Sequence, residues 1–225
     1  MRTVLLISIC IIVLSLMVGI FLSPSLPADL PSHWNLNGDV DGYMPKDLAL
    51  FFLPILALVI MSLMVILPRY DPDHDRYSEF QSAYDGLILL IVLFLTILYL
   101  VTILWALGTH IPMNSLMSVM FGLLFIGIGI FFRSVKKTWF VGIRTPWTLL
   151  SEQVWQKTHQ IGSWVFISAG FLCLGGVLYP TYAYLFVLVP ILGGVVGLFI
   201  YSYILYSKEN TIDSGSPKNK KEEEK

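Results

Sequence analysis

Charged residues are scarce in this sequence. Only 13% of its 225 residues are Asp, Glu, Lys or Arg, and 56% are hydrophobic, whereas a soluble globular domain typically carries about 25% charged residues. The chain has too little charge to cover a surface that faces water, so we expect a membrane protein surrounded by a lipid bilayer. Its formal net charge of −1 provides no excess of positive charge for a nucleic acid, and we expect no such partner.

Cysteine is rare as well. The two cysteines, Cys10 and Cys173, each lie within a long apolar run. A disulfide framework needs several cysteines in water-exposed loops, and a structural zinc site needs clustered Cys and His ligands. Neither pattern occurs, so we expect small buried hydrophobic side chains at both positions, no metal site and no cofactor.

Long hydrophobic runs, in contrast, are frequent. A membrane-spanning helix needs about 20 mostly apolar residues, and six stretches qualify. They are residues 3–22, 48–67, 87–107, 115–132, 163–179 and 182–206. The first run exceeds the about 7–15 residues of a signal-peptide core and lacks a small-residue cleavage site after it, so we expect an uncleaved helix. The predicted fold class is all-α, a polytopic membrane protein with six transmembrane helices.

The basic residues predict how the chain crosses the membrane. All except Lys46 fall in the N-terminus, in the connections after the second and fourth spans, or in the tail: Arg2, Arg69, Arg76, Arg133, Lys136, Lys137, Arg144, Lys157, Lys208, Lys218, Lys220, Lys221 and Lys225. Connections rich in Lys and Arg stay in the cytoplasm. Both termini are therefore predicted to be cytoplasmic, and the loop between the first two spans to lie outside the cell.

The spans and connections divide the chain into four segments. They are a two-helix membrane module over 1–67 with an outer loop over 23–47, a connecting loop and third span over 68–114, a three-helix module over 115–206 with a cytoplasmic loop over 133–162, and a tail over 207–225. The tail holds Ser, Gly, Pro and Asn followed by a run of Lys and Glu, a composition that predicts disorder.

Glycines mark the three-helix module. Gly193 and Gly197 have the GxxxG spacing that lets membrane helices approach closely, and the fourth and fifth spans are also glycine-rich. We expect this spacing to serve packing within the chain, with dimerisation as the less favoured alternative.

The outer loop, residues 23–47, is richer in structure-forming residues than a simple connection. Its prolines favour extended backbone, and Asn37-Gly38 and Asp41-Gly42 are turn dipeptides, so we expect a small ordered extracytoplasmic cap with a short β-hairpin. His33, Asp39 and Asp41 could bind a cation or a peptide, or could only hydrogen-bond their own turns. The candidate residues of the cap are Pro27, Pro31, His33, Trp34, Asn35, Gly38, Asp39, Asp41, Gly42 and Lys46.

The connection after the second span is acidic and reads Asp71-Pro72-Asp73-His74-Asp75. A cluster of carboxylates and a histidine is able in principle to bind a cation. The proline and the close spacing favour a solvated turn instead, so we expect no metal there.

The cytoplasmic loop, residues 133–162, is dense in polar and aromatic residues. Thr145 followed by Pro146 predicts a helix N-terminus, and Ser151 can cap a second helix that continues into the fifth span. Trp147, Leu150 and Val154 have the spacing of an apolar stripe lying on the membrane surface.

Charged residues of the same loop are expected near the lipid headgroups. They are Arg144, Glu152, Lys157 and His159. Glu152 and His159 are seven residues apart and would share one helix face. These residues form either an interfacial salt-bridge network or a docking surface for a cytoplasmic protein or an amphipathic peptide.

Two motifs carry a resemblance to a known family. GIRTPWTL (142–149) and SEQVWQKTH (151–159) resemble the signature of the SdpI family, although members commonly have Asn where this sequence has Thr138. The outer segment LPADLPSHWNLNGDVDGYMPK (26–46) resembles the uncharacterised membrane domain that often precedes that signature.

The resemblance implies a multi-pass protein of the kind that gives a cell immunity to its own secreted toxic peptide and retains a transcriptional repressor at the membrane. Its signature residues, and hence the implied partner- or peptide-binding residues, are Gly142, Arg144, Thr145, Pro146, Trp147, Glu152, Trp155 and His159.

Three classes of function are compatible with a membrane protein of this kind. The favoured one is a binding and signalling protein that senses, or protects against, a secreted antimicrobial peptide. A small-solute transporter is the alternative, although ion-coupled transport usually places ionisable residues within the spans and the six predicted spans contain none. An enzyme is least favoured, since neither His33 with Asp39 and Asp41 nor Glu152 with His159 forms a recognisable nucleophile–base or metal-ligand motif.

Overall fold

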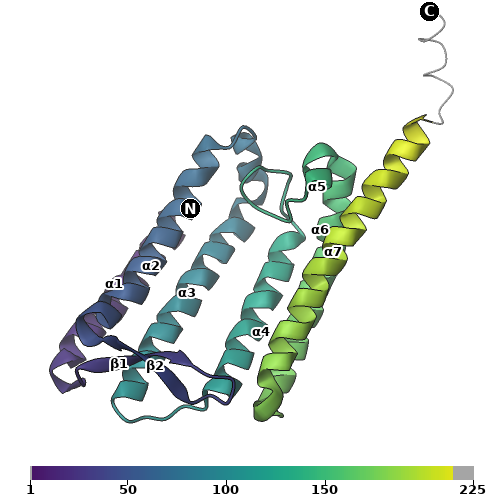
Figure 1. Ribbon diagram of the computed structural model, residues 1–225. Helices are drawn as coiled ribbons and strands as arrows, with labels where there is room; N and C mark the ends of the chain where they lie inside the picture. Colours follow the sequence, from purple (N-terminus) through teal and green to yellow (C-terminus); the bar gives the residue numbers. More distant parts are fainter. Residues whose placement is uncertain (1, 215–225) are drawn as a thin grey trace, which may run out of the picture.

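The computed structural model describes residues 2–214, which form a bundle of helices with one β-hairpin (Figure 1). The helices are α1 (Arg2–Leu22), α2 (Lys46–Ile66), α3 (Gln81–Ala106), α4 (Met113–Phe132), α5 (Pro146–Leu150), α6 (Glu152–Leu174) and α7 (Ala183–Ser214), and the strands are β1 (Asp29–Trp34) and β2 (Val40–Pro45). All of these helices except α5 are long and apolar enough to cross a membrane. The predicted all-α, polytopic membrane fold is confirmed.

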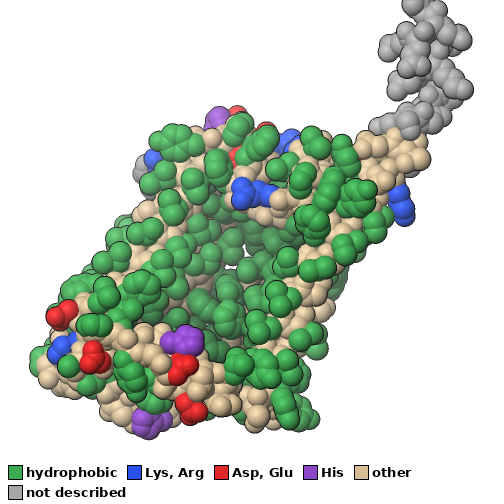
Figure 2. Space-filling view, in the orientation of Figure 1, with side chains coloured by type: hydrophobic (Ala, Val, Ile, Leu, Met, Phe, Trp, Pro, Cys, Tyr) green, Lys and Arg blue, Asp and Glu red, His purple; other side chains and the backbone are tan. Residues whose placement is uncertain are grey.

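The surface has the pattern of a membrane protein. Figure 2 shows hydrophobic side chains over the middle of the visible face, with charged side chains gathered towards its two ends. Because the hydrocarbon core of a bilayer excludes unpaired charge, the apolar middle is the part that lies in lipid.

Two helices begin well before the residue predicted from hydrophobicity. Helix α3 begins at Gln81 rather than at residue 87, and α6 begins at Glu152 rather than at residue 163. In α6 the polar first turns belong to the helix because Ser151 Oγ caps it by accepting from Val154 N at 3.2 Å. Hydrophobicity marks the part of a helix that lies in lipid, and local hydrogen bonds extend the helix beyond it.

The end of α7 corrects the prediction of a disordered tail. The helix continues to Ser214, so residues 207–214 are helical. Thr211 Oγ1 donates to the Ser207 carbonyl at 2.9 Å within this extension. The remainder of that predicted segment, residues 215–225, lies outside the described residues.

The bundle consists of two groups of three helices. Helices α1, α2 and α3 pack on one another, α4, α6 and α7 do the same, and α3 packs on α4 between the groups. The lack of a side chain at Gly122 allows α4 and α6 to approach closely, because a Cβ there would lie only 2.9 Å from the Gly170 carbonyl oxygen. The packing role predicted for Gly193 and Gly197 is wrong, since a Cβ at either would meet no atom of the described structure within 4 Å.

Strands β1 and β2 form an antiparallel hairpin between α1 and α2, with Leu30 paired to Met44 and Trp34 paired to Val40. At its tip the Asn35 side chain accepts from the backbone N–H of Asn37 at 2.9 Å and of Asp39 at 3.0 Å. Gly38 has φ 87°, a left-handed conformation that glycine adopts at little cost. The hairpin lies at one end of the bundle, opposite the connections that precede α3 and α6 (Figure 1).

Candidate functional site

Two connections meet at the end of the bundle opposite the hairpin. One follows α2 and includes the short 3-10 helices Leu67–Tyr70 and His74–Phe80, and the other joins α4 to α6 and includes α5. We call their hydrogen bonds and ion pairs the interloop contact. It joins the N-terminal group of helices to the C-terminal group.

Asp71 is the centre of the interloop contact. Its Oδ2 accepts hydrogen bonds from Trp139 N at 2.9 Å, Phe140 N at 3.3 Å and Tyr77 Oη at 3.0 Å, and its Oδ1 accepts from Asp73 N at 2.9 Å. Only 2% of Asp71 is exposed. The solvated turn predicted for this segment is therefore wrong at Asp71, because N–H and O–H donors from the protein replace water around its carboxylate.

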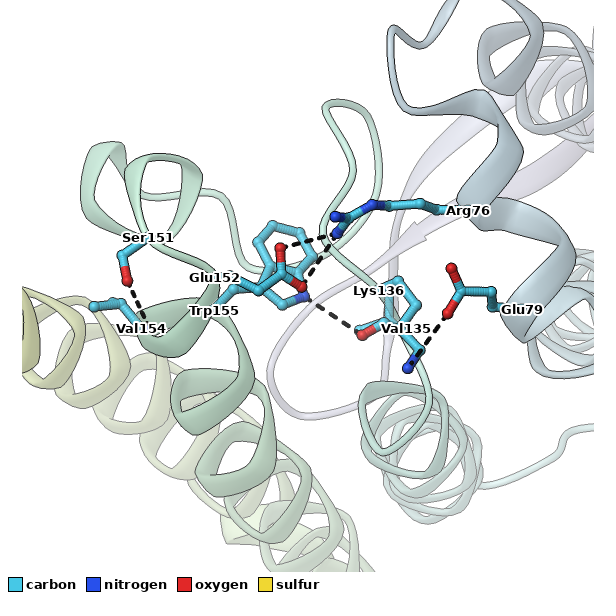
Figure 3. A network of polar contacts seen from close by, with 8 residues as sticks. All are labelled: Arg76, Glu79, Val135, Lys136, Ser151, Glu152, Val154 and Trp155. Carbon is cyan, nitrogen blue, oxygen red and sulfur yellow. Dashed lines mark hydrogen bonds and ion pairs between the residues drawn. The ribbon is translucent and has the colours of Figure 1, made fainter.

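Two ion pairs complete the interloop contact (Figure 3). Arg76 Nη1 donates to both carboxylate oxygens of Glu152, at 3.1 and 2.9 Å, and Lys136 Nζ lies 3.5 Å from Glu79 Oε2. The Arg76 and Glu152 side chains are 38% and 43% exposed, so water screens the pair and its contribution to stability is small. The ion pair instead orients the first turn of α6 relative to the connection after α2.

His159 is buried among packed side chains inside this end of the bundle. It is 2% exposed, stacks on Trp155 at a centroid distance of 4.1 Å, and meets the Phe132 ring edge-on. His159 and Glu152 do lie on one face of α6, since both line the same pocket, but α4 covers the part of that face on which His159 lies. Sequence spacing gives the face of a helix but not the neighbour that covers it.

The hydrogen bonds of His159 define its tautomer. Nε2 accepts from the backbone N–H of Ile143 at 2.8 Å, so Nδ1 carries the proton and donates to the Trp155 carbonyl at 2.8 Å. Gly142 has φ 119°, and a Cβ there would lie 2.7 Å from both His159 Nε2 and the Trp155 ring. Gly142, Trp155 and His159 are thus one packed unit that shapes the backbone before α5.

Thr145 and Pro146 begin α5 as predicted. Thr145 Oγ1 accepts from Thr148 N at 3.2 Å, and Thr148 Oγ1 accepts from Thr145 N at 2.9 Å, a reciprocal capping box. The predicted apolar stripe does not form, because α5 ends at Leu150 and the chain turns at Ser151. Trp147 packs on Phe199 and Tyr203 of α7, Val154 is buried, and Leu150 is 66% exposed.

The residues of the predicted cap hold the hairpin together. His33 Nδ1 lies 2.5 Å from Asp41 Oδ1, and Lys46 Nζ donates to the Ser23 carbonyl at 3.2 Å. Asp39 takes part through its backbone, whose carbonyl accepts from Asn35 N at 2.8 Å. Within residues 2–214 no group of three or more His, Cys, Asp and Glu residues is arranged to hold a metal ion. His33 and Asp41 contact each other within the loop, and binding of a peptide there stays a prediction.

Two parts of the chain match known protein families. Residues 134–204 match the SdpI/YfhL protein family, and residues 10–58 match a domain of unknown function, DUF1648. The chain is 28% identical over 205 residues to the Immunity protein SdpI of Bacillus subtilis (strain 168), covering 91% of this chain and 96% of that protein. The chain is thus similar to SdpI-family membrane proteins. No solved structure matches it.

With six apolar helices and this similarity to SdpI, the chain is a multi-pass protein of the cell membrane. The SdpI/YfhL match includes α5, Glu152 and His159, and the DUF1648 match includes the hairpin. Asp71, Arg76 and Glu79 lie between the two matches. They join the two matched regions through the interloop contact.

The functional candidates that the sequence did not reveal are residues of the connection after α2. They are Asp71, Arg76, Tyr77 and Glu79. One signal was available in the sequence, since a chain with so few charges concentrates several of them just after its second span. Their partners are far along the chain, and only the fold shows them.

Proposed function

We propose that this protein gives its cell immunity to a secreted antimicrobial peptide, and that it reports the presence of that peptide to a cytoplasmic repressor. The observation that carries the proposal is the similarity to the Immunity protein SdpI, which extends over 91% of this chain. The protein acts in this proposal by binding and by changing conformation, without a chemical reaction.

The hairpin supports the outer part of the proposal because it contacts both groups of helices. Asn114 Nδ2, in α4, donates to the Leu36 carbonyl at the hairpin tip and to the Pro180 carbonyl just before α7, each at 3.1 Å. A peptide that binds at this end and moves the hairpin would therefore act on α4 and α7 together.

The interloop contact supports the inner part. At the end of the bundle opposite the hairpin, it joins the connection after α2 to the connection between α4 and α6 by hydrogen bonds and ion pairs. A peptide that binds one arrangement of the two groups of helices better than another shifts the population toward that arrangement. The interloop contact would open or close with that shift, and so would change the surface offered to the cytoplasm.

Within the signature, Arg144 is the residue best placed for a partner. Gly142, Thr145, Trp155 and His159 pack or hydrogen-bond inside the protein, whereas Arg144 is exposed and donates to the Trp139 carbonyl. Its guanidinium also has the donors to bind a carboxylate. In this proposal Arg144, with the exposed rings of Trp139 and Phe140, contacts the repressor.

The immunity proposal is tested by survival. A susceptible strain carrying the gene, and the same strain with an empty vector, are challenged with a panel of membrane-active peptides, and the amount of protein in the membrane is measured by immunoblot. We expect protection against at least one peptide. Equal killing of both strains by every peptide, with the protein present in the membrane, would overturn the proposal.

The signalling proposal needs a separate readout. A fluorescent fusion of a repressor encoded beside the gene is followed in the protected strain, with and without the protective peptide. We expect peptide-dependent recruitment to the membrane, abolished by Arg144→Ala but unaffected by Arg69→Ala, since Arg69 is also exposed but lies outside the signature. A repressor that stays in the cytoplasm in all strains contradicts signalling and leaves immunity intact.

A further inference from the structure

An open pocket of about 680 Å³ lies beside the interloop contact, between the end of α4 and one face of α6. Figure 3 shows five of its residues from close by: Glu79, Val135, Lys136, Glu152 and Trp155. Three of its charged residues, Glu79, Lys136 and Glu152, belong to the two ion pairs already described. The pocket has further polar residues that neither the interloop contact nor the packing of His159 uses.

Arg133 gives the pocket a positive charge that the protein does not neutralise. It is the first residue after α4, its Nε donates to Ser163 Oγ at 3.3 Å, and its guanidinium carbon lies 4.9 Å from the centroid of the Trp164 ring. Within residues 2–214 no Asp or Glu lies within ion-pair distance of Arg133, whereas Lys136 and Glu152 in the same pocket each have an oppositely charged partner.

Two glutamines add neutral donors. Gln156 and Gln160 both line the pocket, one helical turn apart on α6, and the described part of the chain provides neither amide with a hydrogen-bond partner. Ser163 continues the same face of α6 by a further turn. A guanidinium, two amides and a hydroxyl that converge on one space are the donors that bind phosphate oxygens.

The pocket also lies at the level where a lipid presents its phosphate. Helix α4 has 20 residues, so at 1.5 Å per residue it is about 30 Å long, which matches the hydrocarbon thickness of a bilayer. Arg133 at its end and Trp164, which is 59% exposed, are residues typical of the membrane–water interface. Phe132 and Trp164 give the pocket apolar walls suited to the glycerol and upper acyl chain.

We propose that this pocket binds the headgroup of an anionic phospholipid, with Arg133 on the phosphate and Gln156 and Gln160 on the remaining oxygens. The lipid would sit beside Lys136 and Glu152 and brace the interloop contact from the membrane side. Basic pockets between membrane helices are established binding places for anionic headgroups in general. This inference is independent of the proposed immunity function, because it concerns a structural ligand of the resting protein.

Native mass spectrometry of the full-length protein in detergent tests the proposal. Phosphatidylglycerol, phosphatidylcholine and inorganic phosphate are titrated separately, and the bound adducts are counted. We expect one phosphatidylglycerol to bind more tightly than phosphatidylcholine, and millimolar inorganic phosphate not to displace it. Displacement by inorganic phosphate, or equal binding of the two lipids, would overturn a site for an anionic lipid.

Substitutions locate the site. Arg133→Gln is expected to weaken phosphatidylglycerol binding by about tenfold, which corresponds to about 1.4 kcal/mol. Arg69→Gln removes the same charge from an exposed residue outside the pocket and should leave the affinity unchanged. If both variants bind like the unmodified protein, or both lose the same amount, the pocket is not the site.

A second variant guards against a folding defect in Arg133→Gln. The double substitution Gln156→Leu and Gln160→Leu keeps every charge and changes two exposed residues, so the fold should persist as judged by its thermal unfolding. We expect a weaker but measurable loss of phosphatidylglycerol affinity. If the double variant, Arg133→Gln and Arg133→Lys all bind phosphatidylglycerol with the affinity of the unmodified protein, the pocket is not the lipid site.

Discussion

The carboxylate of Asp71 accepts a hydrogen bond from the backbone N–H of Trp139 at 2.9 Å, and this bond joins two connections that lie 68 residues apart in the chain. The same oxygen also accepts from Phe140 N and Tyr77 Oη. One buried side chain therefore holds the interloop contact together, and the ion pairs around it set its orientation.

Asp71→Asn is predicted to destabilise the protein. An amide group replaces one of the two carboxylate oxygens, so at least one of the donors around Asp71 loses its acceptor in a buried place. The expected cost is about 1–3 kcal/mol, seen as a lower midpoint of thermal unfolding in detergent. Asp75→Asn is the matched control because the Asp75 side chain is 96% exposed; a loss of the same size in both variants would contradict the role given to Asp71.

Gly142→Ala is predicted to be more damaging. A left-handed conformation at a non-glycine residue costs about 1–3 kcal/mol, and the new Cβ would also overlap His159 and Trp155. We expect little folded protein in the membrane, measured by size-exclusion chromatography of a fluorescent fusion. Gly86→Ala tests glycine replacement as such, since a Cβ at Gly86 meets nothing within 4 Å, and should fold normally. Normal folding of Gly142→Ala would disprove the packed unit.

Exchanging the charges of Arg76 and Glu152 is predicted to restore the stability that either single substitution loses. Arg76→Glu and Glu152→Arg each place like charges together and should lower stability, whereas the double swap restores an attractive pair. Because both side chains are partly exposed, the coupling energy from a double-mutant cycle should be only about 0.2–1 kcal/mol. Additive losses in the double variant would show that the two side chains do not interact.

The orientation of the chain in the membrane is a prediction from its basic residues. Single cysteines at the exposed positions of Asp39 and Asp75, in a chain with Cys10 and Cys173 replaced by Ala, are treated on intact cells with a membrane-impermeant maleimide. Asp39→Cys in the hairpin should react and Asp75→Cys should react only after the cells are opened. The reverse pattern would place the hairpin in the cytoplasm.

Local features were predictable from the sequence because their causes are local. The six spans follow from apolar runs that no soluble domain needs, and the start of α5 follows from Thr145 and Pro146, whose capping bonds reach only three residues along the chain. The signature motifs likewise stood out as contiguous segments.

The site itself was only partly predictable because its contacts are long-range. Arg76 and Glu152 are 76 residues apart, and no pattern in either segment identifies the other as its partner. For His159, spacing along α6 correctly gave a helix but could not show that α4 covers that face. The packing role of Gly193 and Gly197 was wrongly predicted for the same reason, since a GxxxG motif does not specify which helix packs against it.

The most direct test of the account combines the interloop contact with immunity. Once a peptide is found against which the gene protects, its half-killing concentration is measured for cells that make equal amounts of the unmodified protein, Glu152→Arg, or Arg76→Glu with Glu152→Arg. The account predicts strong protection by the unmodified protein, reduced protection by Glu152→Arg and recovery in the double swap. Equal protection by all three proteins would contradict it.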